Sequence, residues 1–464
     1  MNDTGARAGQ HMSPESAHQP DTYPLSSTQL LWCGLDLGDD AGSFSPRFNA
    51  CRAVRISGKL DVDALQRALD DLVERHEILR TIVVRDAEPK YQQVRPPAPV
   101  PLEVRDVVPI AGQPRDVQAE TQAQEAMLRS VDPRVVPLLR SVLIRLDDND
   151  SILVIVVHHT AVDGWSLQLL LRDLSVLYAA HLTGRDAVLP PVTQYREFVA
   201  WEHDRITGPA AEEAMRYWRE KLHGGETFAV PTDRPIPDRH TKDYSASYFA
   251  VDAEVITAAA ELARSMRSSL FFVLMSAFSV LAHRITGTTD PIFNAIAAGR
   301  NEVQSQNVVG SIMNILPLRT DIRGCNTFRD VIANTRQTCV EAYSYEMPFR
   351  QIVDEMPGIV RAKTDPWVCE FFVTMSQSQF DESDFQFGEK SYQIRKWVID
   401  EPETTGPPEG FAWLIDILPS GELTGHILYN TDEIDESKAV GWATSYRQIL
   451  AAGVRAPDRE WRTL

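Results

Sequence analysis

Two adjacent histidines at the end of an apolar run are the residues of this chain best suited to proton transfer. Residues 158–166 are His-His-Thr-Ala-Val-Asp-Gly-Trp-Ser, and the preceding run, 152–157, contains only Ile, Leu and Val. An imidazole exchanges protons near neutral pH because its ordinary pKa is about 6.5. A buried strand that ends in a turn would therefore deliver His158 and His159 to a place where they can act on a substrate.

The two histidines have different expected roles, because successive side chains of a strand point to opposite faces. We expect His159 to act as a general base, a role that typically contributes ~10²–10⁴ in rate. The alternative is a core histidine satisfied by the backbone. His158 is expected to make structural hydrogen bonds. No metal site is expected, since adjacent strand residues do not readily chelate one ion and no third ligand has a fitting spacing.

The turn after the histidines supplies further candidates. Asp163 can fix the local geometry, and Gly164, which lacks a Cβ, allows close approach of backbone or ligand. Ser166 is expected to cap a helix whose leucines at 167, 170, 171, 174 and 177 share one face. The positive end of that helix would then lie beside the two imidazoles.

Strand-like and helix-like segments alternate along the chain, which predicts a mixed α/β fold. A polar turn at 147–150 between the apolar runs 140–146 and 151–157 predicts a hairpin. Asp61 is the expected N-cap of an amphipathic helix. Further strands are expected at 49–56, 82–84 and 292–297, and further helices at 210–222 and 269–285.

Length and composition set limits on the class of protein. A chain of 464 residues suggests two or three domains. The net charge of -19 argues against non-specific binding to nucleic acid, which requires basic surface. The five cysteines are odd in number and contain no CxxC pair. We therefore expect neither a disulfide framework nor a cysteine metal site, and we expect a cytoplasmic location.

No targeting or membrane segment is expected. The first 20 residues lack the apolar core of a signal peptide, and residues 1–21 are expected to form a disordered lead. The longest apolar stretch, 270–282, falls short of the ~18–20 residues that span a bilayer and predicts a buried helix. Proline-rich crossings at 189–191 and 230–235 place a domain boundary near residue 205.

The chain resembles the condensation domains of nonribosomal peptide synthetases. Residues 158–166 match that family's HHxxxDGxS motif and 75–81 its RHExLRT segment, and Glu197 replaces the Asp of its YxDFxxW motif. The motifs occur in the family's order from residue 22 to about 375. The other matching segments are 24–32 (the opening motif), 195–201 (YxDFxxW), 309–314 (IGxFxN), 346–349 (xxPFE) and, as a faint echo of RDxSRNPLF, 361–367.

The resemblance implies two lobes like chloramphenicol acetyltransferase, arranged as a V-shaped pseudo-dimer around a central tunnel. The lobes would be residues 22–205 and 206–464. No cofactor would be bound permanently. The phosphopantetheine arm of a discrete carrier protein would enter one mouth of the tunnel, and a soluble small-molecule acceptor would enter the other. No adenylation or carrier motif is present, so a free-standing enzyme is expected, similar to stand-alone members in siderophore and enediyne pathways.

The resemblance also implies roles for individual residues. Asp163 would be a structural anion, with Arg300 as its expected partner and Arg80 as the alternative, although a second catalytic base is the other possibility. Gly164 would let the pantetheine arm pass, and its N–H could stabilise an oxyanion. A simple turn glycine is the alternative. Trp165 would pack at the tunnel, and Asn314 would either line the tunnel or serve the structure. Residues 371–373 are expected to form a core strand, with a substrate pocket as the alternative.

Three functions follow as hypotheses. The first is a condensation enzyme that transfers an aminoacyl or other acyl group from a carrier thioester to an amine or alcohol, giving an amide or ester. The second is a coenzyme-A-dependent acyltransferase of the same superfamily, which shares HHxxxDG. The third is a non-catalytic docking module, whose relatives typically lose the second histidine or the glycine. An epimerisation domain is disfavoured by the sequence that follows Gly164.

Overall fold

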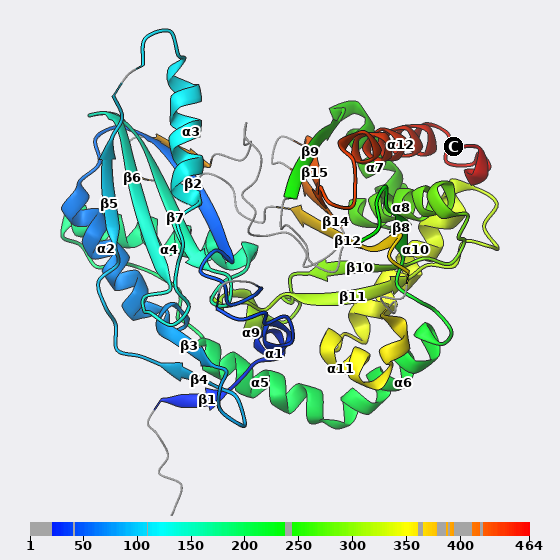
Figure 1. The fold of residues 1–464 in the computed structure, drawn as a ribbon, viewed down its shortest axis with the longest axis horizontal. Helices are drawn as coiled ribbons and strands as arrows, with labels where there is room; N and C mark the ends of the chain where they lie inside the picture. The colour runs from blue at the N-terminus through cyan, green and yellow to red at the C-terminus, as the bar shows by residue number, and fades with distance from the viewer. Residues whose placement is uncertain are drawn as a thin grey trace, which may run out of the picture.

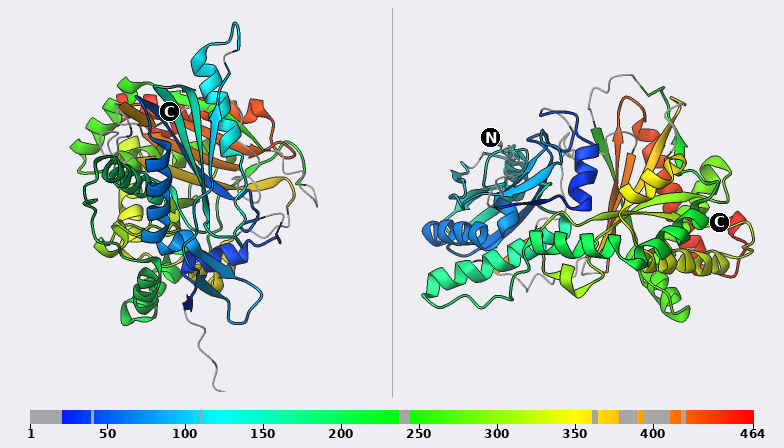
Figure 2. Two further views of the ribbon diagram at one scale, coloured as in Figure 1. Left: turned by 90° about the vertical axis from the view of Figure 1, so that its left-hand side faces the viewer. Right: turned by 90° about the horizontal axis from the view of Figure 1, so that it is seen from below.

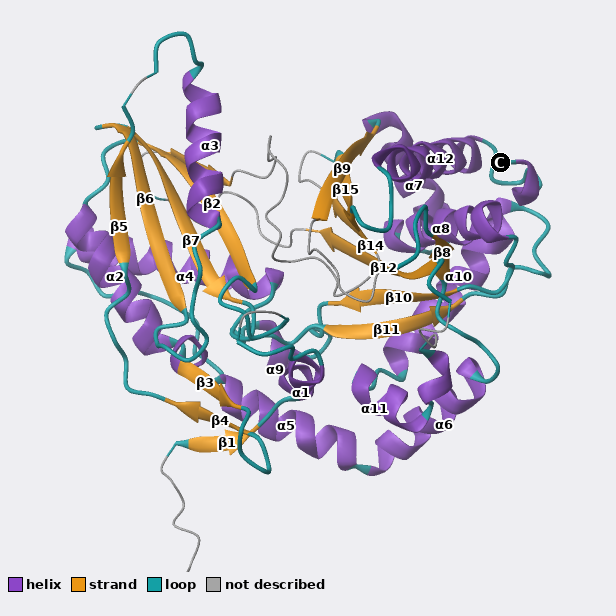
Figure 3. Ribbon diagram, viewed as in Figure 1, coloured by secondary structure: helices purple, strands orange, loops and turns teal. Residues whose placement is uncertain are grey.

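The chain folds into two lobes that lie side by side, each with a sheet and covering helices (Figures 1 and 3). The computed structural model describes residues 21–39, 42–108, 110–236, 244–360, 365–377, 387, 390–393, 411–417 and 421–464. The expected lead at 1–21 lies outside these residues, apart from Asp21. The fold is mixed α/β, as the alternation of segments predicts.

The sheet of the first lobe has the order β13-β2-β7-β6-β5. β6 and β7 pair antiparallel, which confirms the predicted hairpin, and β7 also pairs antiparallel with β2. β7 lies in the middle of the sheet and its apolar side chains are buried on both faces. The bounds of these strands are β2 (Asn49–Ser57), β5 (Leu102–Asp106), β6 (Leu139–Asp147), β7 (Asp150–His158) and β13 (Lys390–Gln393).

Helices cover both faces of this sheet. α2 (Val62–Arg75) and α4 (Gly164–Thr183) pack on one face, and α3 (Arg115–Met127) packs on the other. α2 begins as predicted, since the carboxylate of Asp61 accepts a hydrogen bond from Ala64 N at 2.8 Å. After α2 come η1 (Glu77–Arg80) and a small sheet in the order β1-β4-β3, formed by Thr22–Pro24, Tyr91–Val94 and Thr81–Val84.

The second lobe contains a larger mixed sheet in the order β11-β10-β12-β14-β15-β9, with β8 paired to β12. Its helices α7, α8, α10 and α12 lie on the side of the sheet away from the first lobe (Figure 1). The bounds are β8 (Ala229–Pro231), β9 (Tyr244–Val251), α7 (Ala253–Ser265), α8 (Leu270–Thr286), β10 (Ile292–Ala297), α9 (Val303–Gln306), β11 (Asn314–Arg319), α10 (Phe328–Ser344), α11 (Phe349–Glu355), η2 (Pro357–Ile359), β12 (Val368–Gln377), β14 (Phe411–Ile417), β15 (Leu423–Asn430), α12 (Glu436–Arg455) and η4 (Trp461–Thr463).

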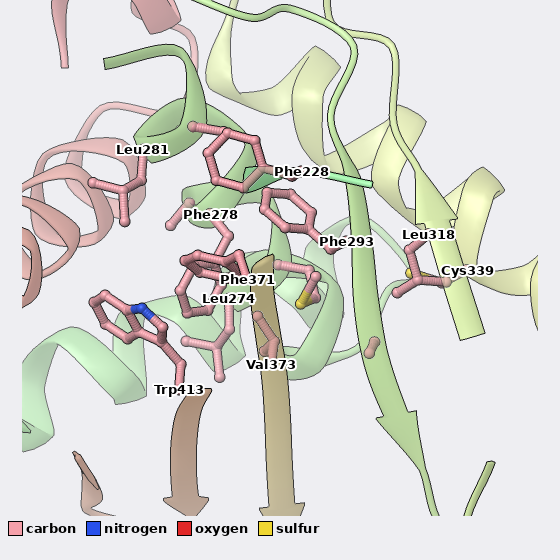
Figure 4. Close-up of a cluster of buried hydrophobic side chains, with 14 of the residues drawn as sticks. Phe228, Leu274, Phe278, Leu281, Phe293, Leu318, Cys339, Phe371, Val373 and Trp413 are labelled. Atoms are coloured by element: carbon pink, nitrogen blue, oxygen red, sulfur yellow. The ribbon is translucent and has the colours of Figure 1, made fainter. Parts of the chain in front are cut away.

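Aromatic and aliphatic side chains pack together in the core of the second lobe (Figure 4). Phe278 of α8 packs against Phe371 and Trp413, with ring centroids 5.7 and 5.1 Å away. Phe371 and Val373 are each 1% exposed, which confirms that 371–373 is a core strand. α8 is the buried helix expected from its apolar sequence. In the described part of the chain, no helix by itself has the length and hydrophobicity to cross a bilayer. α7 and α8 pass that test only together, and they meet at a bend of 107°.

The expected domain boundary near residue 205 falls inside a helix, and a segment from beyond it belongs to the first lobe. α5 (Tyr195–Thr207) continues through that position and is followed directly by α6 (Pro209–Leu222), so the two helices run along one side of both lobes (Figures 1 and 2). β13, which the predicted boundary assigns to the second lobe, pairs with β2 in the first. Phe387 also packs into the core of the first lobe. The C-terminal half therefore completes the N-terminal sheet.

Candidate active site

His158 is the last residue of β7, and its side chain turns into the interior, where it is fully buried. Nδ1 accepts hydrogen bonds from Thr160, at 2.8 Å from Oγ1 and 3.3 Å from N. Nε2 donates to the carbonyl of Ser45 at 3.1 Å. Burial lowers the pKa of His158 to about 4, so the ring is neutral at neutral pH. These contacts confirm the predicted structural hydrogen bonds.

His159 faces the opposite way, as the alternation along a strand predicts, and it is half-buried. Its Nδ1 is buried and has no hydrogen-bond partner of good geometry, whereas its Nε2 is not fully buried. Burial lowers the pKa of His159, while the carbonyls of His159 and Val162 and the carboxylate of Asp163 act in the opposite direction. The ring is therefore neutral at neutral pH and has one accessible nitrogen.

The His159 ring packs against two aromatic residues to which the sequence assigned no role. The ring of Phe48 stacks on it with centroids 4.9 Å apart, and the ring of Trp32 contacts it edge-to-face at 5.5 Å. Trp32 belongs to the opening motif, so the sequence marked its segment as important but did not indicate what Trp32 does. Phe48 lies just before β2 in a segment without a motif, so the sequence contained no signal for it.

The helix after the histidines begins at Gly164, and Asp163, not Ser166, is its N-cap. Oδ1 of Asp163 accepts from Ser166 N at 2.7 Å. The prediction of a Ser166 cap was wrong because the hydroxyl of Ser166 bonds elsewhere: it donates to Gly310 O at 2.8 Å and accepts from Gly310 N at 3.0 Å. The first N–H groups of α4 consequently lie close to the histidine turn, since a helix leaves them without backbone partners.

Asp163 is paired with Arg300, one of the two partners considered. Nη2 of Arg300 donates to Oδ1 and Oδ2 of Asp163 at 3.0 and 2.9 Å, and both residues are buried. Arg300 also donates through Nη1 to the carbonyls of Ser305 and Val308, each at 2.6 Å. Arg80, the alternative partner, instead donates to the carbonyl of Arg95.

Gly164 and Trp165 are the first two residues of α4. Gly164 is exposed, and a Cβ placed there would meet its nearest atom, Arg52 Nη2, only at 3.8 Å. Trp165 is half-buried and donates from Nε1 to Gln306 O at 3.0 Å. Both sites lie at the start of α4, next to the second lobe.

Asn314 has a structural role in addition to any contact with substrate. Its Oδ1 accepts from the backbone N–H of Ile315 and Phe349, and its Nδ2 donates to Glu346 Oε1 and Met347 O. It also lines a cavity at the junction of the lobes, together with Thr28, Leu31, Trp201 and Arg205. These contacts give Asn314 a structural role, and lining of the tunnel stays a prediction.

Three of the sequence motifs meet at the junction of the lobes. α1 (Ser27–Gly34) begins at its N-cap Ser26, whose hydroxyl lies 2.6 Å from the Tyr195 hydroxyl. Tyr195 donates in turn to Ser311 O at 2.7 Å, and Thr28 donates to Met313 O at 3.0 Å. Segments 24–32, 195–201 and 309–314 therefore form one interface.

The RHExLRT segment fixes α4 from its other side. Asp173 of α4 lies 2.9 Å from Arg75 Nε and 3.0 Å from His76 Nε2, and its side chain is buried. Burial raises the pKa of Asp173, but the hydrogen bond from His76 and the nearby guanidinium groups outweigh that effect and hold it at about 2. Of the last motif, 361–367, the first four residues lie outside the described residues.

Comparison with known proteins identifies the family. The family model for the condensation domain matches residues 19–464. The crystal structure of the SgcC5 protein from Streptomyces globisporus, in complex with (R)-(-)-1-(2-naphthyl)-1,2-ethanediol and sucrose, is 33% identical with a TM-score of 0.86, and the match covers 94% of this chain and 100% of that chain.

Sequence relatives include much larger proteins. One of the linear gramicidin synthase proteins from Brevibacillus parabrevis is 31% identical over 95% of this chain, and chondramide synthase cmdD from Chondromyces crocatus is 29% identical over 96%. The chain spans 6% and 11% of their lengths. The solved X-domain from teicoplanin biosynthesis, 22% identical with a TM-score of 0.77 and matched over 97% of this chain and 99% of that chain, shares the fold. The chain belongs to the condensation-domain family.

Proposed function

We propose that this protein transfers an acyl group from the phosphopantetheine thioester of a carrier protein to an amine or alcohol, forming an amide or ester. The observation that carries the proposal is the state of His159: a neutral ring, half-buried, with Nδ1 inside the protein and Nε2 accessible. A neutral imidazole can accept a proton from an attacking nucleophile.

The chemistry balances without a bound cofactor. The nucleophile attacks the thioester carbonyl as Nε2 of His159 takes its proton, and the oxygen of the tetrahedral intermediate carries the negative charge. The N–H of Gly164 and the positive end of α4 stabilise that charge. When the carbon–sulfur bond breaks, the proton on His159 passes to the departing thiolate, which leaves as the free thiol of the carrier.

Asp163 is a poor candidate for the base in this scheme. Its two oxygens accept from Arg300, from Ser166 N and from Ile312 N at 3.1 Å. A carboxylate held by a guanidinium and two amides has no free lone pair aimed at a substrate. We therefore assign Asp163, Arg300 and His158 to the structure of the site and His159 to the chemistry.

The comparisons support the choice of donor and acceptor. The synthases that match this chain are many times its length, as expected for relatives in which condensation domains work beside other domains. The SgcC5 chain, by contrast, is matched over its whole length, and its structure contains an aryl ethanediol. These facts support a separate carrier protein as donor and a small alcohol or amine as acceptor, and an alcohol would depend more heavily on His159 because it is the weaker nucleophile.

A transfer assay tests the proposal. Carrier protein charged with a panel of aryl and aminoacyl groups is mixed with the enzyme and either an aryl ethanediol or its amino analogue, and intact-mass spectrometry follows loss of the acyl group. The same acyl groups are supplied in parallel as coenzyme A thioesters. We expect release from the carrier with formation of ester or amide. Faster transfer from coenzyme A would favour the acyltransferase alternative, and no transfer from either donor would favour the docking module.

A further inference from the structure

The imidazole of His159 belongs to a cluster of three rings from separate segments of the chain. Phe48 stacks on it with an interplanar angle of 18°, and Trp32 meets it at 61°. Trp32 and Phe48 also contact each other, with centroids 5.0 Å apart and an angle of 71°. Each ring thus touches the other two, and the geometry of any one depends on the remaining pair.

The two partners of the imidazole are fixed in different ways. Phe48 is tied to the first lobe, because its carbonyl accepts from His159 N at 2.9 Å. Trp32 is tied to the second lobe, because its Nε1 donates to the Ser311 hydroxyl at 3.1 Å. Trp32 is 7% exposed and Ser311 is fully buried, so water does not compete for this bond.

The orientation of the His159 ring depends on these contacts because the other neighbours of the ring, the carbonyls of His159 and Val162, make no hydrogen bond of good geometry with Nδ1. Nδ1 has no hydrogen-bond partner of good geometry. In most active-site histidines a hydrogen bond to one nitrogen aims the other. Here aromatic packing replaces that bond, and the packing extends through Trp32 to Ser311 in the other lobe.

We propose that Trp32 is a positioning residue that links the orientation of the His159 ring to the contact between the two lobes, through its hydrogen bond to Ser311. The proposal rests on the proposed function, since it assigns Trp32 a task in aiming the catalytic ring. When the lobes separate and the Trp32–Ser311 bond breaks, the ring loses the partner that holds its edge.

Two substitutions remove the bond from opposite ends. Trp32→Phe deletes the donor and keeps an aromatic ring, and Ser311→Ala deletes the acceptor. We expect each to lower kcat roughly tenfold with little change in KM, because misplacing a reacting group by about 1 Å can cost up to ~10²-fold. The double variant should be no slower than the worse single variant, since both remove one interaction.

Trp218→Phe is the matched control. Trp218 is fully buried in the second lobe, and its Nε1 donates to Tyr345 O at 2.7 Å, so the substitution removes an equivalent indole hydrogen bond away from the site. We expect its kcat to equal that of the wild type. Equal kcat values for Trp32→Phe and Trp218→Phe would overturn the proposal.

A spectroscopic measurement tests the contact without relying on activity. A protonated imidazole beside an indole quenches its fluorescence, so the difference spectrum between wild type and Trp32→Phe should titrate with His159 and lose that titration in His159→Gln. The titratable groups that face His159 are Asp163 and His158 on its own segment, whereas Phe48, Trp32 and Ser311 from the other elements carry no charge.

Trp32→Ala provides the second spectroscopic outcome, observed by NMR of the His159 ring. Opening the cluster to water should raise the pKa of His159 toward ~6.5. An unchanged ring pKa, or a Trp32 signal that does not titrate, would overturn the proposal. If both spectroscopic results appear but His159→Gln transfers at the wild-type rate, the proposed function fails while the link between Trp32 and His159 stands.

Discussion

Nη2 of Arg300 lies 3.0 and 2.9 Å from the two carboxylate oxygens of Asp163, and this buried ion pair joins the lobes beside the histidine turn. Asp163 is the N-cap of α4, which begins at Gly164, and Arg300 donates hydrogen bonds to two carbonyls of the segment after β10. One contact therefore fixes the helix end and the opposing loop together.

Removing either partner should destabilise the fold. Asp163→Ala and Arg300→Ala each leave a buried charge unpaired, which costs about 3–5 kcal/mol. Asp163→Ala also removes an N-cap, worth about 0.5–2 kcal/mol, so its effect should be at least as large. Urea unfolding monitored by circular dichroism measures both.

The matched control for this pair is Asp106→Ala, which breaks the ion pair with Arg145. Those side chains are 71% and 44% exposed, so water screens their attraction and the substitution should lower the free energy of unfolding far less than Asp163→Ala does. Loss of less than about 1 kcal/mol in Asp163→Ala would show that the buried pair does not hold the lobes as described.

His158 should make stability depend on pH. Its pKa is lowered to about 4 in the folded protein, against about 6.5 when unfolded, so the unfolded state binds the proton more readily. The free energy of unfolding should therefore fall as pH drops from about 6.5 to 4 and lose no more below that. The shift corresponds to about 3 kcal/mol.

His158→Gln, which keeps a donor near the Ser45 carbonyl, tests this assignment. Urea unfolding at pH 7, 5.5 and 4.5 should give a shallower dependence on pH for the variant than for the wild type. The buried His76 contributes in the same direction in both proteins, because burial lowers its pKa too. Parallel curves for the two proteins would rule out His158 as a source of the dependence.

Two glycines near the site should respond differently to a methyl group. A Cβ at Gly310 would lie 2.1 Å from the Tyr195 ring, whereas one at Gly164 meets nothing closer than 3.8 Å. Gly310→Ala should lower the free energy of unfolding by about 1–3 kcal/mol. Gly164→Ala should leave stability unchanged but slow transfer about tenfold, because the methyl group occupies the approach of the thioester to the helix end. A fully active Gly164→Ala enzyme would reduce Gly164 to a turn residue.

The acid limb of the rate profile reports on His159. Burial lowers its pKa, so the neutral base persists below the usual range and is lost only as pH falls through the lowered value. The dependence of kcat on pH should therefore have its acidic midpoint below about 6.5. A midpoint at or above 6.5 would contradict a desolvated ring.

Features set by local sequence were predictable. The polar turn at 147–150 gave the hairpin, Asp61 gave the start of α2, and strand alternation separated the roles of His158 and His159. The partner of Asp163 was narrowed to two arginines by resemblance and charge, and Arg300 is the one present. The hairpin, the helix start and the two histidine roles depend on residues close together in sequence. The Asp163–Arg300 pair could be predicted because a buried charge needs a partner of opposite charge.

Features set by distant contacts were not predictable. The pairing of Lys390 with Ser57 joins residues from opposite halves and has no local signal. Ser166 had the composition of a cap, but its hydroxyl serves Gly310 in the other lobe. Phe48 became part of the site only because the strand that follows it, β2, pairs with the end of β7.

The rate of acyl transfer by His159→Ala tests the central claim most directly. Single-turnover transfer from a charged carrier should fall by ~10²–10⁴. Circular dichroism should show that the variant still folds, although it loses the contacts of the ring with Phe48 and Trp32. The control is His181→Ala. His181 lies near the C-terminal end of α4 and pairs with Asp71 of α2, so this variant should keep the wild-type rate. A His159→Ala enzyme as fast as the wild type would contradict the account.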